Sequence, residues 1–459
     1  MIFLKFTAEG LAASSYLIGS GREAVVIDPR RDIDVYLGAA RERCMEIKYI
    51  LETHRHEDFL AGSLPLKAQT GGLICRGTND EVRYGDVRLK DGDTLKCGRM
   101  FIRALETPGH TMDSLSYALY EAENPDVALM VFSGDVLFAG SCGRIDFYGE
   151  ERKAECAGML YRSIHEKLLP LGDQTILCPA HGAGSVCGAG ISDRDETTLG
   201  YERLANRWLS YDRDTFVGKK AAEKPLYPPY FHRMEVLNAA GAPPIKAGPG
   251  PKPVMPGELA EAMLESGIQL IDTRLPQAFA GGHIPGSISI WPGGNAVFPG
   301  WLLDAGKPVY LVTERPEDVA TVTRLLARIG FGNVEGYLCG GFETWQNQGM
   351  SVEHVGAISV DALKALSDAG GIRIVDVRDP DEWQDGIMPG AEMRFVGTLK
   401  DNLPDGPKDV PIAVTCSIGH RGSIGASILR NAGFTNVYTV LGGTTAWANR
   451  GFPMVKPPA

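Results

Sequence analysis

The chain has 459 residues, which is too long for a single hydrophobic core and predicts two to four domains. Its formal net charge of −11 argues against a nucleic-acid-binding surface. The sequence contains no apolar run near the ~18 residues that cross a membrane, and its first residues lack a basic leader. The nine cysteines follow no regular spacing and indicate reduced thiols. We therefore expect a cytoplasmic protein that acts on small molecules.

Residues 1–200 alternate β-branched runs with polar turns and helical stretches. The runs that we expect to form strands are 15–19, 23–29, 48–54, 100–110, 114–119 and 127–136. The stretches that we expect to form helices are 33–43, 155–171 and 195–209. This mixture predicts a layered α/β sandwich.

The composition changes between Lys224 and Gly257, where proline and glycine become frequent. Such a density of proline and glycine disfavours helices and central strands, and it predicts a connector. We place the first domain at 1–235 and the linker at 236–257. Tyr227, Tyr230 and Phe231, near the start of this stretch, are expected to pack onto a domain.

Beyond the linker the sequence repeats itself after about 100 residues. LIDTRLPQAFAGGHIPGS at 270–287 matches IVDVRDPDEWQDGIMPGA at 374–391. IGFGNVEGYLCGGFETW at 329–345 matches AGFTNVYTVLGGTTAW at 432–447. Each half has the order strand, turn, helix, so the repeat predicts two small α/β domains in tandem.

We place these two domains at 258–352 and 353–459. Each carries a tryptophan shortly after a Gly-Gly turn, Trp345 in the first repeat and Trp447 in the second. We expect both indoles to pack in the cores of their domains.

Cys416 follows a hydrophobic strand in the second repeat, and a short loop leads from it to a helix that begins near Arg421. In such a loop the backbone N–H groups and the helix dipole converge on one point, and a thiol at that point has a lowered pKa. Gly419 permits the tight curvature, and Arg421 adds a cation. Cys416 and Arg421 enclose four residues, one fewer than in cysteine phosphatases. The smaller ring favours a single terminal sulfur over a phosphate.

Together with IVDVRDPDEW and LGGTTAW, this loop resembles the rhodanese (sulfurtransferase) family over the whole of 353–459. The resemblance implies that Cys416 is a nucleophile that carries a persulfide, cradled by the backbone amides of 417–421. His420 is a candidate for tuning the choice of acceptor. The residues expected to contact the sulfur substrate are Ser417, Ile418, Gly419 and His420.

The first repeat keeps the rhodanese-like pattern without its reactive residues. Alignment of the repeats places Thr313 opposite Cys416 and Asp318 opposite Arg421. We therefore predict that 258–352 is a non-catalytic rhodanese-like domain, serving as a spacer or a docking surface.

Residues 53–59, THRHEDF, stand at the end of a β-rich run in the first domain. His54, His56 and Asp58 have the spacing of metal ligands. Phe59 occupies the next position, where a two-metal site of this pattern would carry a further histidine. Phenylalanine cannot bind a metal, so the sequence disfavours a dinuclear cluster.

Three further stretches accompany THRHEDF, namely TPGHTMDS, FSGDVLFAGSCGRIDF and CPAHGAG. In this order they resemble the metallo-β-lactamase superfamily, specifically its glyoxalase II and persulfide dioxygenase branches, across 1–230. The resemblance implies an αββα sandwich. The predicted fold class is therefore α/β multidomain, with this sandwich followed by two tandem rhodanese-like domains.

The persulfide dioxygenase resemblance implies that His54, His110 and Asp135 bind one Fe(II) per chain. Two histidines and a carboxylate with open positions opposite are typical of non-haem Fe(II) oxygenases. The residues expected beside the ligands, orienting them or bound water, are His56, Asp58 and His181. A role for His56 as a fourth ligand stays open.

Arg144, in GSCGRIDF, has two possible roles that the sequence leaves open. Its guanidinium either binds an anionic group of the substrate or pairs with Asp146.

The whole chain resembles the bacterial persulfide dioxygenase–sulfurtransferase fusions of sulfide detoxification. This implies oxidation of a low-molecular-weight persulfide such as that of glutathione or coenzyme A by O₂, coupled to transfer of sulfur to sulfite or from thiosulfate. The resemblance also implies a homo-oligomer, and we expect neither a nucleic acid nor a membrane as partner. The alternative is a glyoxalase II-like dinuclear zinc thioester hydrolase fused to a sulfurtransferase.

Overall fold

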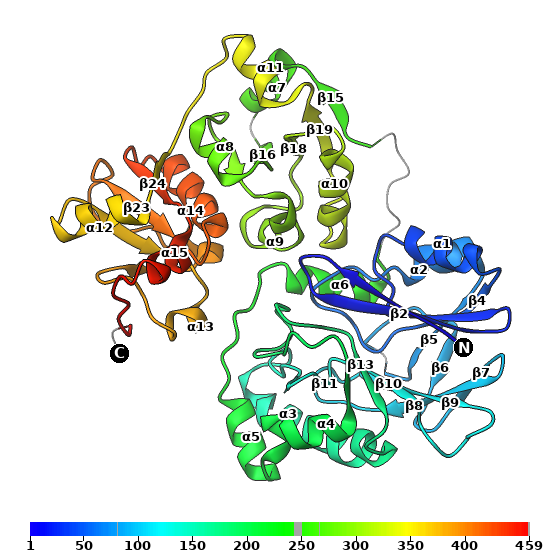
Figure 1. Cartoon of the computed structure of the whole chain (residues 1–459). Helices are drawn as coiled ribbons and strands as arrows, with labels where there is room; N and C mark the ends of the chain where they lie inside the picture. The colour runs from blue at the N-terminus through cyan, green and yellow to red at the C-terminus, as the bar shows by residue number, and fades with distance from the viewer. Residues whose placement is uncertain (80, 243–249, 266, 458–459) are drawn as a thin grey trace. The chain divides into compact units, whose positions relative to one another are not determined.

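The computed structural model describes residues 1–79, 81–242, 250–265 and 267–457. The chain forms two compact units, Met1–Ile245 with Ala327–Gly330 and Lys246–Leu326 with Phe331–Ala459. Figure 1 shows the elements of both units.

The N-terminal unit contains two six-stranded sheets. The first has the order β1-β2-β3-β4-β5-β6, with β1 (Ile2–Ala8), β2 (Ala13–Ser20), β3 (Glu23–Ile27), β4 (Glu46–Leu51), β5 (Leu73–Gly77) and β6 (Val87–Leu89). The second has the order β14-β13-β10-β9-β8-β7, with β7 (Thr94–Cys97), β8 (Met100–Glu106), β9 (Leu115–Glu121), β10 (Met130–Gly134), β13 (Ile176–Pro179) and β14 (Thr197–Thr198). A short hairpin of β11 (Leu137–Phe138) and β12 (Ser141–Cys142) follows β10.

Helices flank the two sheets on both outer faces (Figure 1). They are α1 (Asp34–Glu42), α2 (Ser63–Thr70), α3 (Lys153–Arg162), α4 (Leu199–Ala205), α5 (Arg213–Ala221) and α6 (Phe231–Ala240). α3 continues as a π-helical turn, Ser163–Leu168, and a 3₁₀ turn, Leu169–Leu171. Tyr230 and Phe231, at the start of α6, are buried as predicted.

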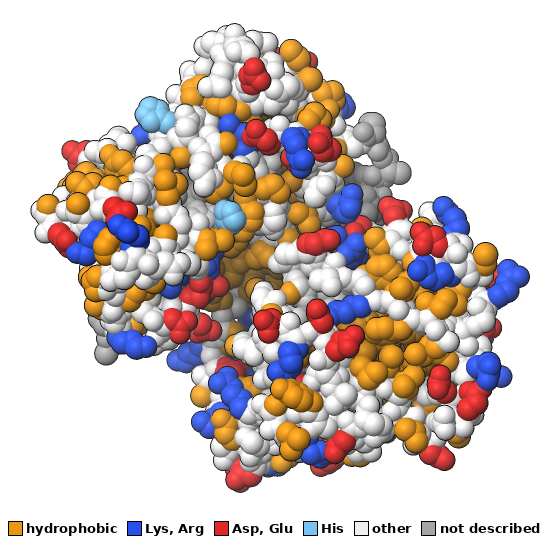
Figure 2. Space-filling model, viewed as in Figure 1, with side chains coloured by type: hydrophobic (Ala, Val, Ile, Leu, Met, Phe, Trp, Pro, Cys, Tyr) orange, Lys and Arg blue, Asp and Glu red, His pale blue; other side chains and the backbone are white. Residues whose placement is uncertain are grey.

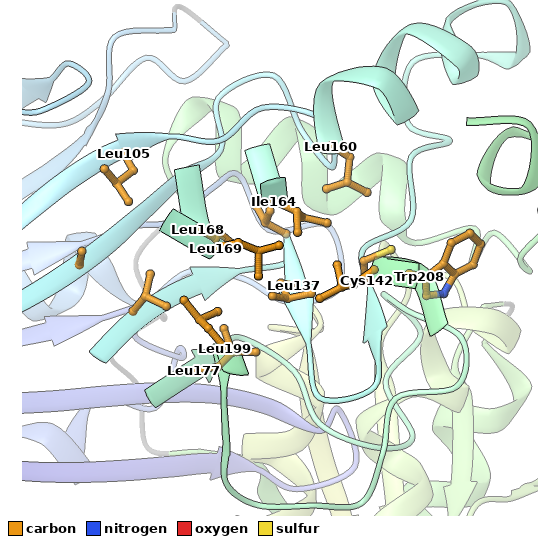
Figure 3. Packing of buried hydrophobic residues seen from close by; sticks show 14 of the residues in the cluster. Leu105, Leu137, Cys142, Leu160, Ile164, Leu168, Leu169, Leu177, Leu199 and Trp208 are labelled. Carbon is orange, nitrogen blue, oxygen red and sulfur yellow. The ribbon is translucent and has the colours of Figure 1, made fainter. Parts of the chain in front are cut away.

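Three layers of buried side chains hold this unit together. Ile27, Ile102 and Phe132 belong to the layer between the two sheets. Tyr36 of α1 and Leu66 of α2 belong to a second layer, under the first sheet. The third layer lies between the second sheet and the helices that follow it; its residues labelled in Figure 3 are Leu105, Leu137, Cys142, Leu160, Ile164, Leu168, Leu169, Leu177, Leu199 and Trp208. These layers confirm the predicted αββα sandwich.

Two elements lie inside the stretch predicted to be a connector, so the prediction of a linker over 236–257 is wrong at both ends. α6 runs to Ala240, and β15 spans Lys252–Val254. FHRMEVLNAA contains neither proline nor glycine and can therefore form a helix. β15 tolerates Pro253 because it is the edge strand of its sheet. Residues 243–249 lie outside the described residues.

The C-terminal unit contains two five-stranded parallel sheets with equivalent strand orders. The first has the order β15-β19-β18-β16-β17, with β16 (Gln269–Asp272), β17 (Ile288–Ser289), β18 (Val309–Val312) and β19 (Val334–Leu338). The second has the order β20-β24-β23-β21-β22, with β20 (Gly356–Ile358), β21 (Arg373–Asp376), β22 (Glu392–Met393), β23 (Ile412–Thr415) and β24 (Val437–Val440).

Helices connect these parallel strands. In the first repeat they are α7 (Pro256–Leu264), α8 (Pro276–Gly281), α9 (Phe298–Leu302), α10 (Asp318–Arg328) and α11 (Gly341–Asn347). In the second they are α12 (Val360–Asp368), α13 (Pro380–Trp383), α14 (His420–Asn431) and α15 (Gly443–Asn449). Trp345 and Trp447 are buried, as predicted.

Both repeats keep the same buried ion pair at the ends of two equivalent strands, β16 and β21. Arg274 Nη2 donates to Asp272 at 2.6 Å, and Arg378 Nη2 donates to Asp376 at 2.7 Å. Each of these arginines also donates to a backbone carbonyl eight residues further along the chain, that of Gly282 or Gly386. The match confirms that the sequence repeat is a repeat of structure.

The nine cysteines, all of which lie in described residues, are free thiols. Among the helices that the structure describes, none is both long enough and apolar enough to cross a membrane.

Candidate metal centre and thiol loop

The three predicted metal ligands of the N-terminal unit, and His181 predicted beside them, all follow the ends of strands. His54 follows β4 of the first sheet, whereas His110, Asp135 and His181 follow β8, β10 and β13 of the second sheet. All four side chains are at most 2% exposed. The fold thus brings together residues that are far apart in the sequence.

His54 is held so that one ring nitrogen is free to bind a metal. The Thr53 hydroxyl donates to Asp28 Oδ2 at 2.8 Å, so the hydroxyl oxygen can only accept at its contact with His54 Nδ1, also 2.8 Å long. His54 Nδ1 therefore carries the proton, and Nε2 presents a lone pair. Burial lowers the pKa of His54 well below its usual value, which keeps the ring neutral.

His110 is oriented in the same way as His54, with Nδ1 in a hydrogen bond and Nε2 free. Its Nδ1 lies 2.8 Å from the backbone carbonyl oxygen of Arg144, which can only accept a hydrogen bond. Burial lowers the pKa of His110, so the neutral ring presents its Nε2 lone pair. Orientation of a ligand histidine by a carbonyl or a carboxylate is common in metal sites.

The free atoms of the three predicted ligands face one another. Asp135 Oδ2 lies 3.9 Å from His54 Nε2 and 3.4 Å from His110 Nε2. Within the described residues, no hydrogen-bond partner meets any of these three buried atoms. Ligand atoms at about 2.1 Å from one ion lie about 3 to 4 Å apart, so this set fits a divalent metal.

Glu57 also reaches this centre, and the sequence reasoning missed it. Its Oε2 lies 3.8 Å from His110 Nε2, and one ligand atom each from His54, Glu57 and His110 lie within 4.8 Å of one another. Burial raises the pKa of Glu57 well above its usual range. The only sequence signal for Glu57 was its position inside THRHEDF. In an extended segment successive side chains point to opposite faces, so Glu57 would be expected to point away from His56 and Asp58.

His56 and Phe59 pack beside the ligands. His56 Nε2 lies 3.3 Å from Asp28 Oδ1, and its Nδ1 has no hydrogen-bond partner in the part of the chain that the structure describes. Burial lowers the pKa of His56, but Asp28 more than offsets this and the pKa is raised. The Phe59 ring, 3% exposed, lies with its centroid 4.4 Å from that of His56.

Asp28 supports this arrangement and was also missed. It accepts hydrogen bonds from the Thr53 backbone at 2.7 Å and from the Thr53 hydroxyl. Its φ of 50° lies in the left-handed region, which few residues other than glycine adopt. Such strain at a non-glycine residue is typical of functional sites.

His181 lies between two carboxylates. Its Nδ1 is 2.7 Å from Asp135 Oδ1, and its Nε2 is 2.9 Å from Asp58 Oδ2. Burial lowers the pKa of His181, but Asp135 and Asp58 more than offset this and hold it well above its usual value. The predicted polar neighbours Asp58 and His181 are therefore linked to the metal centre through Asp135.

Arg144 pairs with Asp146, one of the two roles that the sequence left open for it. Its Nε and Nη2 donate to Asp146, both at 2.7 Å, and its Nη1 donates to the carbonyls of Val186 and Leu226. Aromatic rings pack around the guanidinium; they belong to Phe147, Tyr227 and Phe231. The pairing with Asp146 fixes a loop whose backbone carbonyl orients His110.

A separate cleft opens on the N-terminal unit, with a volume of about 670 Å³. Its lining includes Phe3, Tyr16, Met130 and Ile176, and none of its described lining residues belongs to the histidine cluster. Figure 2 shows hydrophobic side chains gathered on the visible face of this unit.

The thiol loop of the second repeat follows β23, as predicted. Cys416 is 1% exposed, and the Gly419 backbone N–H donates to its Sγ at 3.1 Å. Gly419 has a φ of 105°, which allows the chain to curve into α14 at His420. Because α14 begins directly after Gly419, the positive end of the helix dipole lies next to this thiol.

Arg421 does not stand alone as a cation in this loop. Its Nη2 donates to Glu382 Oε1 at 2.8 Å and to Ser417 Oγ at 2.8 Å, and its Nη1 donates to Glu382 Oε2. Burial raises the pKa of Glu382, but Arg421 more than offsets this and lowers it to about 2. Glu382, in the DPDEW stretch, was not singled out from the sequence. The ion pair fixes the shape of the loop.

The first repeat contributes a side chain to the loop of the second. The Trp291 indole stacks on the His420 ring, with centroids 4.8 Å apart and planes at 18°. Beside it, Ser289 Oγ lies 2.8 Å from Ser423 Oγ. Ile418 is 57% exposed, so its side chain, unlike its backbone, lies at the surface of the loop.

The equivalent loop of the first repeat has different residues at these positions. Thr313 follows β18 as Cys416 follows β23, and Asp318 occupies the position of Arg421. Ala278 stands where the second repeat has Glu382. Arg315, the cation of this loop, donates to Asp318 Oδ1 at 2.7 Å.

Two family models match the chain. The model of the metallo-beta-lactamase superfamily matches residues 8–181. The model of the rhodanese-like domain matches twice, at residues 255–348 and 359–450.

Among known proteins, the chain is similar to the mitochondrial persulfide dioxygenase ETHE1 of Homo sapiens, with 32% identity over 210 residues, 44% of this chain and 74% of that protein. It is also similar to a hydroxyacylglutathione hydrolase of Methylococcus capsulatus, with 37% identity over 165 residues, 36% of this chain and 58% of that protein. A crystal structure of a metallo-beta-lactamase from Staphylococcus aureus subsp. aureus COL covers 74% of this chain and 98% of its own, with 28% identity and a TM-score of 0.65.

Proposed function

We propose, on the premise that this chain belongs to the metallo-beta-lactamase superfamily and within it to the family of the ETHE1 persulfide dioxygenases, that it oxidises a low-molecular-weight persulfide at one iron ion and transfers sulfur through Cys416. The observation that carries the proposal is the convergence of three unpartnered atoms among the described residues, His54 Nε2, His110 Nε2 and Asp135 Oδ2. Two imidazoles and one carboxylate are the ligand set of non-haem Fe(II) oxygenases.

Iron bound by these residues would supply open positions at which a sulfur anion and dioxygen meet. The chain's own residues prepare the site. Thr53 and the Arg144 carbonyl keep the protons on the Nδ1 atoms, so both Nε2 atoms remain free for the metal. Burial of the ligands excludes water from the site. In the overall reaction a persulfide, dioxygen and water yield the thiol, sulfite and two protons.

The thiol loop supports the second half of the proposal. The Cys416 thiolate attacks the outer sulfur of a persulfide, the S–S bond of the substrate breaks, and the thiol leaves with the proton. Sulfite then attacks the outer sulfur on Cys416, which regenerates the thiolate and forms thiosulfate. The Gly419 N–H and the N-terminus of α14 stabilise the anionic sulfur in both forms. The reverse direction, from thiosulfate to a persulfide, uses the same groups.

The first rhodanese-like repeat is proposed to be non-catalytic. Thr313, Asp318 and Ala278 replace the nucleophile, the arginine and its carboxylate partner together. Loss of all three leaves no group to carry sulfur in that loop. The Trp291 stack on His420 indicates that the repeat instead supports the active loop.

Metal analysis combined with oxygen uptake tests the dioxygenase half. The purified chain should hold one iron ion and consume oxygen when glutathione persulfide is the only sulfur substrate supplied. Two zinc ions per chain and hydrolysis of a glutathione thioester, without oxygen uptake, would instead assign a glyoxalase II-like hydrolase.

Product analysis tests the coupling. The two half-reactions together consume two persulfides for each dioxygen and release thiosulfate. With Cys416 inactivated, one persulfide should be consumed for each dioxygen, and sulfite should accumulate. A reaction without enzyme corrects for the direct reaction of sulfite with persulfide.

A further inference from the structure

The loop that carries THRHEDF has little regular structure of its own. Residues 52–60 belong to neither a helix nor a strand, although His54 and its neighbours lie in this stretch. The backbone groups of such a loop, once buried, need hydrogen-bond partners from other parts of the chain. Those partners therefore decide which way the side chains of the loop point.

One side chain of α6, Asn238, binds three backbone groups of this loop. Its Nδ2 donates to the carbonyl oxygens of His56 at 2.6 Å and of Phe59 at 2.7 Å. Its Oδ1 accepts from the Ala61 N–H at 3.0 Å. These bonds use both amide protons and the amide oxygen, and the side chain is only 1% exposed. Asn238 thus holds the loop at three points.

The position of Asn238 in the sequence gives little sign of this role. It stands within 236–257, the stretch that the sequence predicted to be a linker, and it lies inside the ten-residue helix α6. Asparagine is unfavourable inside helices and is seldom fully buried, since its amide competes for backbone groups and loses hydration. A buried asparagine at such a place is explained by the groups that it binds.

A second residue of α6 also reaches the loop. Glu235 Oε1 accepts from the Tyr227 hydroxyl at 2.5 Å, and its Oε2 lies 3.8 Å from Arg55 Nη2. Arg55 Nη2 in turn donates to Glu57 Oε1 at 3.2 Å. The helix therefore contacts the loop through an ion pair as well as through the amide of Asn238.

The two carbonyls that Asn238 binds stand on either side of Glu57 and Asp58 in the sequence. Asp58 Oδ2 lies 2.9 Å from His181 Nε2, and His181 Nδ1 lies 2.7 Å from Asp135 Oδ1. Glu57 offers an oxygen to the histidines of the centre. A change in the backbone path of the loop would therefore be transmitted to the predicted ligand Asp135.

We propose that Asn238 is a positioning residue of the metal centre. It holds residues 56–61 in the backbone path that directs Glu57 and Asp58 inward, and so it couples the geometry of the centre to the docking of α6. It acts through the loop backbone and not on a ligand atom. The inference rests on the metal centre of the proposed function, but not on the identity of the metal or of the substrate.

Asn238→Ala tests this role, because it removes all three hydrogen bonds while alanine favours the helix. The full-length chain is freed of metal and titrated anaerobically with Co(II), whose visible d–d absorption changes with the number and geometry of its ligands. Competition with a chelator gives the affinity. We expect the affinity for Co(II) to fall at least about tenfold, since loss of a supporting residue of a metal site costs about 10- to 100-fold, and we expect the visible spectrum to change.

Asn238→Asp is the sharper variant. It keeps the shape of the side chain and an acceptor for the Ala61 N–H, but an ionised carboxylate has no proton for the two carbonyls. We expect a loss of affinity at least as large as in Asn238→Ala, because a charged oxygen then faces carbonyl oxygens. An unchanged spectrum with an affinity within about twofold of the unsubstituted chain, in both variants, would overturn the proposal.

Leu199→Ala is the control for a general loss of stability. It opens a cavity in the third layer of buried side chains of the same unit, at the start of α4. Thermal unfolding should occur at a lower temperature, but the folded unit should bind Co(II) with the original spectrum and affinity. Shifts as large as those of Asn238→Ala would show that metal binding follows stability alone, and the positioning role would be wrong.

His110→Ala separates this inference from the proposed centre. It should abolish the Co(II) spectrum of the unsubstituted chain, because it removes a ligand. Unchanged Co(II) binding in His110→Ala would contradict the centre, and the positioning role with it. Loss of binding in His110→Ala together with normal binding in both Asn238 variants would contradict the positioning role alone.

Discussion

The metal centre and the thiol loop are built in opposite ways. The metal centre gathers His54, His110 and Asp135 from three separated strand ends, on two different sheets. The thiol loop is one continuous hexapeptide, from Cys416 to Arg421, between a strand and a helix. The first depends on the packing of the whole sandwich, whereas the second depends on the local path of the backbone.

This difference predicts how each site responds to change. Every ligand of the metal centre is held by a neighbour from elsewhere in the chain, such as Asp28 under Thr53 or the Arg144 carbonyl behind His110. The thiol loop has two distant supports, Glu382 and the Trp291 ring stacked on His420, and it draws the rest of its chemistry from backbone N–H groups. Substitutions at one site should leave the other unaffected.

Cys416→Ser should have the largest effect. Removal of the nucleophile should lower sulfur transfer by on the order of 10³-fold or more, because a hydroxyl does not replace a thiolate here. Oxygen uptake should be unchanged. Thiosulfate formation and an oxygen electrode measure the two activities in the same sample, and Cys339→Ser, which removes the half-buried cysteine of the first repeat, is the control. A parallel loss of oxygen uptake would contradict the separation of the sites.

His110→Ala should show the reverse pattern. Loss of a ligand should reduce bound iron and lower oxygen uptake by more than about 100-fold, since losing only a supporting residue of a metal site costs about 10- to 100-fold. Transfer from thiosulfate through Cys416 should continue at the original rate. Elemental analysis reports the metal directly; full iron content with full oxygen uptake would exclude His110 from the centre.

Asp28→Asn should have an intermediate effect on the metal centre. The amide can accept from Thr53 but carries no charge to hold His56, so metal affinity should fall about 10- to 100-fold. Competition with a chelator measures the affinity. Asp195→Asn changes a carboxylate with a 97% exposed side chain and should have no effect, which separates the local role from a change in net charge.

Glu382→Gln should weaken the thiol loop by about tenfold in kcat/KM for sulfur transfer, the loss expected from one charge-assisted hydrogen bond. The pKa of Glu382 is lowered to about 2 from 4.5, so its carboxylate stabilises the folded unit above pH 4.5, and this contribution is lost as the pH falls toward 2. The glutamine variant should therefore lose less stability across that range. Thermal unfolding at a series of pH values checks the sign. If the variant lost as much stability at low pH as the unsubstituted chain, the ion pair with Arg421 would not stabilise the unit.

Thr313→Ala should have the smallest effect, a change in transfer within about twofold, because nothing in the first repeat is proposed to carry sulfur. The sharper form is Thr313→Cys in the Cys416→Ser background. It should restore no transfer, since Asp318 and Ala278 still replace the ion pair of the second repeat. Recovery of transfer would show that the first repeat needs only a thiol to be active.

The elements of the fold follow well from local patterns. The runs at 15–19, 23–29, 114–119 and 127–136 each coincide with a strand, because β-branched residues between polar turns specify strands over a short range. The connector was the clearest miss. Its proline and glycine content concealed α6, whose own ten residues contain neither.

The same distinction between local and long-range information applies to the candidate sites. Cys416 could be placed from the sequence because the strand, the loop and the helix that surround it are neighbours in the chain. Glu57, Asp28 and Glu382 could not, because their roles come from contacts across sheets or between loops. The role of Arg144 was left open by the sequence, and the structure pairs it with Asp146.

By itself, then, the sequence determined the domain order, the repeat, the thiol loop and the residue types of a metal centre. Each of these could be predicted because it is marked by short motifs of neighbouring residues. Only the tertiary structure decided which atoms of those residues are free to bind a metal. That choice depends on the proton of each imidazole, and distant groups hold those protons in place: Asp28 acting through Thr53, and the Arg144 carbonyl.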